Sequence, residues 1–246
     1  MKLTSYKYLP AAFFLLLCSF VYVQNQTTIY IIGDSTAANK SEKSYPETGW
    51  GMTFQSFFKD DVKVDNRALN GRSTKSFRAE KRWDPIMERL KPGDYVFIEF
   101  GHNDEKVDKP NVGVSLADFK TNLVNYVNET RSKNAIPVLL TPISRRSFKN
   151  GILTDSHGGY PNVTRAVADS LKVPLIDMLV KTETLLKGLG DQESIKLFLH
   201  VDSGHVNYPA GKKDDTHLNP VGAMMVAELV AKGIKEQRLK LAKRLK

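Results

Sequence analysis

The stretch from Thr27 to Ala38, TTIYIIGDSTAA, predicts a strand followed by a reactive turn. Residues 27–32 form a continuous β-branched and aromatic run that ends at Gly33, which is typical of a central strand buried on both faces. Ser35 would then lie just beyond the strand, with its hydroxyl at the sheet edge and helix N–H groups nearby, as a nucleophile requires. The alternative for this segment alone is that Asp34 or Ser35 only caps a helix.

Along the rest of the chain, apolar strand-like runs alternate with segments of helical spacing. Further strands are predicted at residues 62–64, 94–100, 136–141 and 173–176. Helices are predicted at residues 49–59, 83–90, 115–128 with Ser115 as N-cap, 160–171, 179–189 with its end at Gly188 or Gly190, and from Asn219 and Pro220 onward. This alternation predicts an α/β fold, a three-layer α/β/α sandwich with a central parallel sheet and ligands at the carboxyl ends of its strands.

The chain of 246 residues is 41% hydrophobic and 26% charged, which is ordinary for a globular protein with a sizeable core. Residues 25–246 are predicted to form a single domain, because no repeat or Pro/Ser-rich linker interrupts them. The formal charge of +9 is concentrated in residues 232–246, where seven bases accompany one acid, so no nucleic-acid groove is expected. This basic end is interpreted as the solvated, lysine-rich end of an amphipathic helix.

Residues 1–24 have the pattern of a secretory signal peptide, with Lys2 and Lys7 ahead of an apolar run at residues 9–23. We therefore expect a secreted or periplasmic protein with no stable membrane association after signal removal, an uncleaved anchor being the alternative. The one cysteine, Cys18, lies in this leader, so no disulfide, thiol nucleophile or cysteine-bound metal is expected in the mature chain. Lipoprotein anchoring at Cys18 is disfavoured because Leu17 before it is not small.

Three further segments contain polar residues that are expected to lie at the same edge of the sheet. Residues 66–73 (NRALNGRS) follow the second strand, and Gly71 can bring its backbone N–H close to a substrate oxygen. Residues 101–104 (GHND) follow the third strand, where Asn103 offers a side-chain amide as another donor. Asp214 and His217 precede the last helix three residues apart, so the carboxylate can reach and orient the imidazole.

These four segments, in this order, resemble the blocks of the SGNH (GDSL-like) hydrolase superfamily. The longer strings GDSTAA, GWG, NRALNGRSTKSF, GHND and KKDDTHLNPVGA resemble its rhamnogalacturonan acetylesterase group. The resemblance covers essentially the whole mature chain and implies a flavodoxin-like SGNH hydrolase fold. It implies Ser35 as the nucleophile, His217 as general base and then acid, and Asp214 as the residue that fixes the imidazole. The implied oxyanion hole comprises the backbone N–H groups of Ser35 and Gly71 and the side-chain amide of Asn103.

The function implied by this resemblance is that of a secreted serine esterase that removes O-acetyl groups from a plant cell-wall polysaccharide by double displacement. Rhamnogalacturonan, a pectin, is the favoured polymer, the partner is the acetylated polysaccharide or oligosaccharide, and a monomer without metal or cofactor is expected. The alternatives are a broader GDSL-type esterase or lipase on other acyl esters and an acetylxylan esterase. A glycan-binding protein on a decayed esterase fold is disfavoured because every block residue is retained. Asp215 stays open as an alternative partner of His217.

No substrate-binding residue is assigned, but two basic clusters would bind uronate carboxylates if they faced the site. They are Arg72, Lys75 and Arg78, and Arg145, Arg146 and Lys149. Solvated loops are the alternative for each cluster.

Several other residues have a simpler structural interpretation. Asp34 is expected to organise its turn, and His102 to be positioned by its loop rather than to act as a second base. Trp50 and Trp83 lie in apolar helical patterns, which favours core packing over stacking on sugar rings. The group His200, Asp202 and His205 matches no strong metal pattern, so a substrate-facing loop is favoured there.

Overall fold

The computed structural model describes residues 26–246, so the expected signal peptide and Cys18 lie outside the described residues. Its centre is a five-stranded parallel sheet in the order β2-β1-β3-β4-β7. The strands are β1 (Thr27–Gly33), β2 (Val62–Asn66), β3 (Tyr95–Glu99), β4 (Ile136–Leu140) and β7 (Leu175–Ile176). Each lies within two residues of a predicted strand at both ends.

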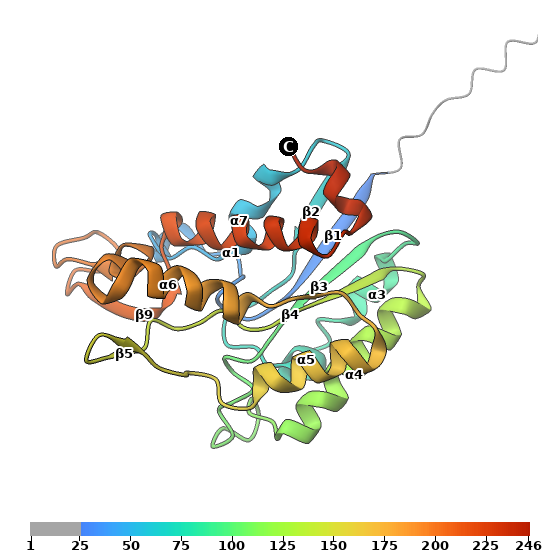
Figure 1. Cartoon of the computed structure of the whole chain (residues 1–246), viewed down its shortest axis with the longest axis horizontal. Helices are drawn as coiled ribbons and strands as arrows, with labels where there is room; N and C mark the ends of the chain where they lie inside the picture. Colours follow the sequence, from blue (N-terminus) through green and yellow to red (C-terminus); the bar gives the residue numbers. More distant parts are fainter. Residues whose placement is uncertain (1–25) are drawn as a thin grey trace, which may run out of the picture.

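Helices cover both faces of this sheet (Figure 1). One face packs against α1 (Trp50–Thr53), α6 (Met178–Ser194) and α7 (Pro220–Glu236). The other packs against α2 (Thr74–Ala79), α3 (Asp84–Arg89), α4 (Leu116–Ser132) and α5 (Tyr160–Leu171). Successive residues of β1 point alternately into the two resulting cores, Ile29 and Ile31 into one and Tyr30 and Ile32 into the other. The architecture is the predicted three-layer α/β/α sandwich.

Two helix starts confirm their predicted caps. The Ser115 hydroxyl accepts a hydrogen bond from the backbone N–H of Asp118 at the start of α4. The Asn219 side chain accepts from the N–H groups of Val221 and Gly222, with Pro220 in the first position of α7. Because Asn219 follows β9 (Lys212–Leu218) directly, this cap also fixes where the polar segment before α7 ends.

One helix prediction needs correction. Residues 49–59 do not form one helix, because the turn of α1 gives way to a 3₁₀ segment, Phe54–Phe57. The helix predicted to end at Gly188 or Gly190 does break at Gly190, whose φ of 75° is not helical, and a further helical turn that was not predicted follows as far as Ser194. Glycine tolerates this left-handed conformation without a Cβ clash, so the chain kinks there and continues.

Two antiparallel hairpins were not predicted. One pairs β5 (Phe148–Lys149) with β6 (Ile152–Leu153), and the other pairs β8 (Phe198–Val201) with β9. The sequence of β9, KKDDTHL, has little of the apolar alternation that marks a strand. Short 3₁₀ segments complete the fold at Glu42–Ser44, Ile195–Leu197 and Lys240–Arg244.

The basic C-terminal end is not the solvated end of a helix, which corrects the prediction. Helix α7 stops at Glu236, and Arg238 adopts a left-handed φ of 51° that turns the chain back. Leu241 and Leu245 are then buried against the α7 side of the sheet, and Leu245 forms a β-bridge with Phe58. The bases stay toward solvent while two leucines anchor the segment. No helix within residues 26–246 has the length and apolar content to cross a membrane.

Replacement of Leu241 by Ala tests this anchoring. Because the side chain is almost fully buried, we expect the free energy of unfolding to fall by about 2–4 kcal/mol in urea titrations. The exposed neighbour Lys243, changed to Ala, is the matched control and should cost less than about 0.5 kcal/mol. Equal, small losses in both variants would contradict the folded tail.

Candidate active site

Four polar segments meet at the carboxyl end of the parallel strands. Ser35 follows β1, Gly71 lies in the loop after β2, and Asn103 lies in the loop after β3. The fourth segment is β9, which returns to the same edge and carries Asp214 and His217. The sheet thus brings together side chains that are far apart in the sequence.

Ser35, His217 and Asp214 form a continuous hydrogen-bonded chain. The Ser35 Oγ lies 2.9 Å from Nε2 of His217, and Nδ1 of His217 lies 2.8 Å from Oδ2 of Asp214. The other oxygen, Oδ1, accepts the backbone N–H groups of Thr216 and His217. Burial alone would raise the pKa of Asp214, but the hydrogen bonds from His217 and Thr216 hold it well below its ordinary value. A carboxylate that stays ionised keeps the Nδ1 proton, which leaves Nε2 free to accept the serine proton.

Asp215 points elsewhere. Its Oδ1 lies 2.8 Å from Nε2 of His200 and accepts a hydrogen bond of 2.9 Å from Arg146. Its side chain is 47% exposed, against 16% for Asp214. The geometry therefore places Asp214, and not its neighbour, against the imidazole of His217.

The three expected oxyanion donors also lie at this edge. Within residues 26–246, no protein acceptor occupies the backbone N–H of Ser35 or Gly71. Gly71 has a φ of 78°, which an L side chain rarely adopts. The Asn103 amide donates one hydrogen bond to the carbonyl of Arg72, and its oxygen accepts from Lys106 at 2.7 Å. These contacts fix which way the amide faces and leave its second N–H for a ligand.

Buried carboxyl groups lie under the turn that carries Ser35 and stabilise it. Asp34 is fully buried, and its Oδ1 accepts the backbone N–H and the hydroxyl of Thr36, which confirms its role in organising the turn. Glu99, the last residue of β3, accepts a hydrogen bond of 2.6 Å from Nε1 of Trp50. A Cβ on Gly33 would lie 2.5 Å from the carbonyl oxygen of Glu99, so only glycine permits this approach of β1 and β3.

Sequence reasoning missed the role of Glu99 and that of Lys106. The signal for Glu99 was a single acid at the end of an otherwise apolar strand. Burial, together with the neighbouring Asp34 carboxylate, raises the pKa of Glu99 to about 8. Lys106 had no signal, since its contact with Asn103 depends on how the loop folds.

Both tryptophans lie in the core, as predicted. Trp50 is fully buried against Phe54 and donates to Glu99, whereas Trp83 packs edge-on against Tyr126 and donates to Glu129. Neither indole has a face open to solvent, so stacking on a sugar ring is excluded for both.

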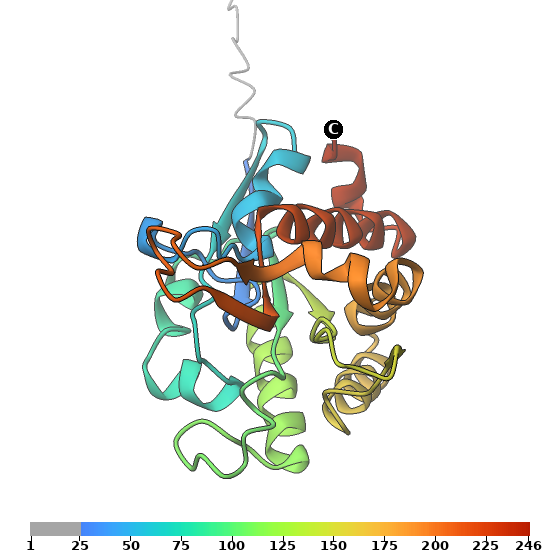
Figure 2. The same cartoon turned by 90° about the vertical axis from the view of Figure 1, so that its left-hand side faces the viewer.

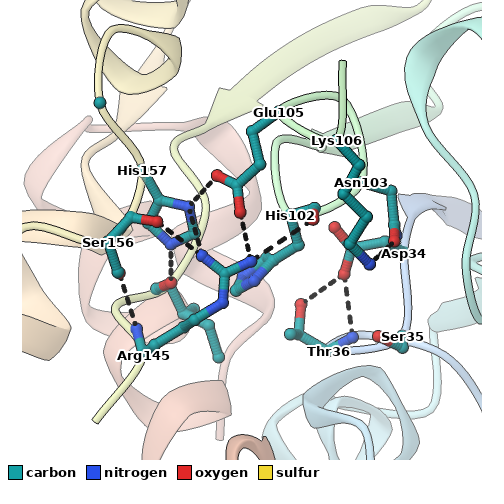
Figure 3. A network of polar contacts seen from close by, with 12 residues as sticks. Asp34, Ser35, Thr36, His102, Asn103, Glu105, Lys106, Arg145, Ser156 and His157 are labelled. Atoms are coloured by element: carbon teal, nitrogen blue, oxygen red, sulfur yellow. Dashed lines mark hydrogen bonds and ion pairs between the residues drawn. The ribbon is translucent and has the colours of Figure 1, made fainter. Parts of the chain in front are cut away.

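His102 is a buried side chain clamped by an ionic cluster (Figure 3). Its ring packs edge-on against His157 with centroids 4.5 Å apart, and burial lowers its pKa. Glu105 joins Arg145 to Nδ1 of His157, while Arg145 also donates to the carbonyl of Ser156. The cluster ties the loop of Asn103 to the segment after β4, as expected of a histidine positioned by its loop.

The two basic clusters do not form free uronate-binding patches. Every arginine in them has a carboxylate partner, and Lys75 donates to the carbonyl of Pro110. The pairs are Arg72 with Glu80, Arg78 with Glu129, Arg145 with Glu105, and Arg146 with Asp191 and Asp215. These partners reduce the charge that the arginines can offer an anion, whereas Lys149, on β5, is exposed and has no carboxylate partner among the described residues.

The histidines before β9 do not assemble a metal site. His200 pairs with Asp215, whereas His205 accepts the backbone N–H of Asn207 and packs near Tyr45 and Tyr208. In the described part of the chain, no three His, Cys, Asp or Glu side chains gather as metal ligands would.

Comparisons with known proteins show the family of this chain. The sequence profile of the GDSL-like Lipase/Acylhydrolase family matches residues 31–224. RhgT of Bacillus subtilis (strain 168), a rhamnogalacturonan acetylesterase, is 40% identical over 215 residues, covering 87% of this chain and 91% of RhgT. YesY of the same strain, named a probable rhamnogalacturonan acetylesterase, is 33% identical over 214 residues, covering 87% of this chain and 94% of YesY.

A solved structure supports the same fold. The crystal structure of the Bacillus subtilis protein YxiM superposes with a TM-score of 0.76 at 27% sequence identity. The match covers 87% of this chain and 58% of the YxiM chain, so YxiM has substantial sequence beyond the shared domain.

The raised pKa of Glu99 predicts a dependence of stability on pH. Between its ordinary pKa of 4.5 and about 8, the unfolded chain ionises this carboxyl while the folded chain keeps it protonated. The folded state then binds more protons, so this group makes stability fall as pH rises, by at most about 1.4 kcal/mol per pH unit. Glu99→Gln removes this dependence, so the variant should gain stability relative to the parent chain between pH 5 and pH 9. Urea titrations at both pH values measure this gain, and an unchanged difference would contradict a protonated Glu99.

Proposed function

The chain belongs to the GDSL-like lipase and acylhydrolase family and is a carboxylic ester hydrolase, and we propose that it deacetylates rhamnogalacturonan or a closely related pectic polymer. The proposal rests on one observation above all, the chain Ser35–His217–Asp214 at the sheet edge, next to the unoccupied N–H groups of Ser35 and Gly71 and the second N–H of the Asn103 amide. The substrate is carried over from RhgT and YesY, which match this chain nearly end to end.

The proposed reaction is a two-step acyl transfer. Ser35 Oγ attacks the acetyl carbonyl while Nε2 of His217 takes the hydroxyl proton. The tetrahedral intermediate collapses with cleavage of the bond to the sugar oxygen, which receives the proton from His217 and leaves. Water then attacks the acetyl-enzyme, giving its proton to His217, and acetate departs as the Ser35 hydroxyl is restored.

The negative charge on the carbonyl oxygen is met by the N–H groups of Ser35, Gly71 and Asn103. Such donors act without reorganising, because Lys106 and the Arg72 carbonyl already fix the Asn103 amide. No metal or organic cofactor takes part in this scheme. We further propose that residues 1–24 direct export to the medium or periplasm, and that the enzyme acts as a monomer.

Acetate release is the direct test of this function. The intact protein should release acetate from acetylated rhamnogalacturonan faster than from acetylated xylan, and should prefer acetyl to butyryl and longer nitrophenyl esters. Ser35→Ala should lower kcat by about 10⁴-fold or more, because the nucleophile is lost. Dialysis against a chelator is the control and should leave the activity unchanged. Preference for xylan or for long acyl chains would leave an esterase with a different substrate.

The adjacent acids provide a matched pair for the mechanism. Asp214→Asn should lower kcat by about 10³- to 10⁴-fold, because an amide cannot hold the same proton on Nδ1 of His217. Asp215→Asn should change kcat less than about tenfold, since that side chain pairs with His200 and Arg146 instead. Steady-state kinetics on 4-nitrophenyl acetate distinguish the two, and the reverse order would reassign the triad.

A further inference from the structure

A cavity of about 350 Å³ lies beside the candidate active site, within the size range of small-ligand pockets. The segment between Ser35 and α1 forms most of its wall, and the remainder comes from Met52 on α1 and Asn207 in the turn between β8 and β9. Its lining includes Lys40, Tyr45, Glu47, Thr48, Met52 and Asn207. None of these side chains takes part in the proposed acyl transfer.

One backbone hydrogen bond and one side-chain hydrogen bond link the cavity lining to residues next to the reacting groups. The N–H of Thr48 donates to the carbonyl of Leu218, the residue after His217, at 2.9 Å. The ammonium of Lys40 donates to the side chain of Asn70, the residue before Gly71, at 2.6 Å. The cavity lining is therefore hydrogen-bonded to the residue after the general base and to the residue before the oxyanion glycine. An acetylated sugar on Ser35 would have its neighbour in the polymer within reach of this space.

Hydrogen bonds within the protein hold the cavity wall in place without a ligand. The amide of Asn207 donates to the carbonyls of Glu42 and Tyr45, and the Tyr208 hydroxyl donates to the carbonyl of Ser44. Figure 2 shows the orange loop between β8 and β9 lying beside the blue segment that follows β1. Since β9 also carries His217, the cavity wall and the general base belong to one hairpin.

The exposed surface of the cavity is partly apolar. Tyr45 is 57% exposed and Met52 is 41% exposed, although such side chains are more often covered. A sugar ring has an apolar C–H face and a rim of hydroxyls, so it can pack on an aromatic ring while hydrogen-bonding at its edge.

The charges of the cavity disfavour an acidic occupant. The Lys40 ammonium is buried, with 1% of its side chain exposed, and lies 2.6 Å from the Glu47 carboxylate. Glu42 adds a second acid at the exposed rim. One cation already matched by a carboxylate, with a further acid beside it, repels a uronate but can hydrogen-bond neutral hydroxyls.

We propose that this cavity is a subsite for a neutral sugar unit next to the acetylated unit of the polymer, with Tyr45 as its main specificity-determining residue. The proposal rests on the proposed function, because it assigns the cavity to the same polymeric substrate. Binding of a second sugar unit in this subsite would make the enzyme prefer oligosaccharides over small acetyl esters.

The test uses acetylated rhamnogalacturonan oligosaccharides of increasing length, with 4-nitrophenyl acetate as the small substrate. In the parent enzyme, kcat/KM should rise once the oligosaccharide is long enough to fill the subsite. Tyr45→Ala should raise KM for these oligosaccharides by about tenfold, the loss of one aromatic contact, with kcat and nitrophenyl acetate kinetics unchanged. Tyr45→Phe should retain the parent KM because it keeps the ring, and Val180→Ala, a change of an exposed residue on α6, is the surface control.

Each outcome separates the subsite from the function. If Tyr45→Ala keeps the parent KM on every oligosaccharide, the subsite is wrong and the proposed function stands. If the parent enzyme hydrolyses nitrophenyl acetate but no oligosaccharide, the proposed function fails and the subsite fails with it. Loss of nitrophenyl acetate activity in Tyr45→Ala would show that the residue supports the catalytic groups, which also overturns the assignment.

A second variant tests the neutral character of the occupant. Glu42→Gln should change KM for the oligosaccharides by less than about twofold, since a neutral sugar ring interacts only weakly with the negative charge that is removed. A several-fold fall in KM would instead indicate a uronate in the cavity and overturn the proposed sugar class.

Discussion

The hydrogen bond between Ser35 and His217 joins two side chains 182 residues apart, and the rest of the structure is arranged to make it. Ser35 is placed by β1, an inner strand of a parallel sheet whose strands all end at one edge. His217 is placed by a separate antiparallel hairpin and by the Asn219 cap, which ties the end of β9 to α7. A shift of either element by one residue would turn the side chain away, so the sandwich and the hairpin must both form before the site exists.

The close approach of the strands near Ser35 also lowers the stability of the fold. Gly33 lets β1 approach β3 so closely that Asp34 and Glu99 are buried near each other, where two charged carboxylates repel. Trp50, Thr36 and the N–H of Ile143 supply Glu99 with hydrogen bonds, which stabilise the pair only in part. Rigidity of the nucleophile turn is thus obtained at some expense of stability, a common balance in active sites.

Sequence patterns predicted the parts of the molecule that local chemistry determines. The apolar run before Gly33, the caps at Ser115 and Asn219, and α5 at its full bounds all depend on neighbouring residues. The β8–β9 hairpin was not predictable, because β9 is polar and its pairing comes from tertiary contacts. The buried tail leucines and the ion pairs of the arginine clusters were missed for the same reason, since their partners lie far away in the sequence.

The β8–β9 hairpin, which was not predicted, contributes both to the candidate active site and to the cavity wall. In β9, Asp214 pairs with Leu199 of β8 and His217 lies in the irregular stretch before Leu218. The turn of the same hairpin holds Asn207 and Tyr208 against the segment that follows Ser35. The segment that contains Ser35 and the β8–β9 hairpin therefore contact each other at two places, once at the reacting atoms and once at the cavity wall. A ligand that fills the cavity would contact both elements, and its binding energy would lower KM for the polymer without changing kcat. Recognition of the polymer and placement of the general base would then depend on the same hairpin.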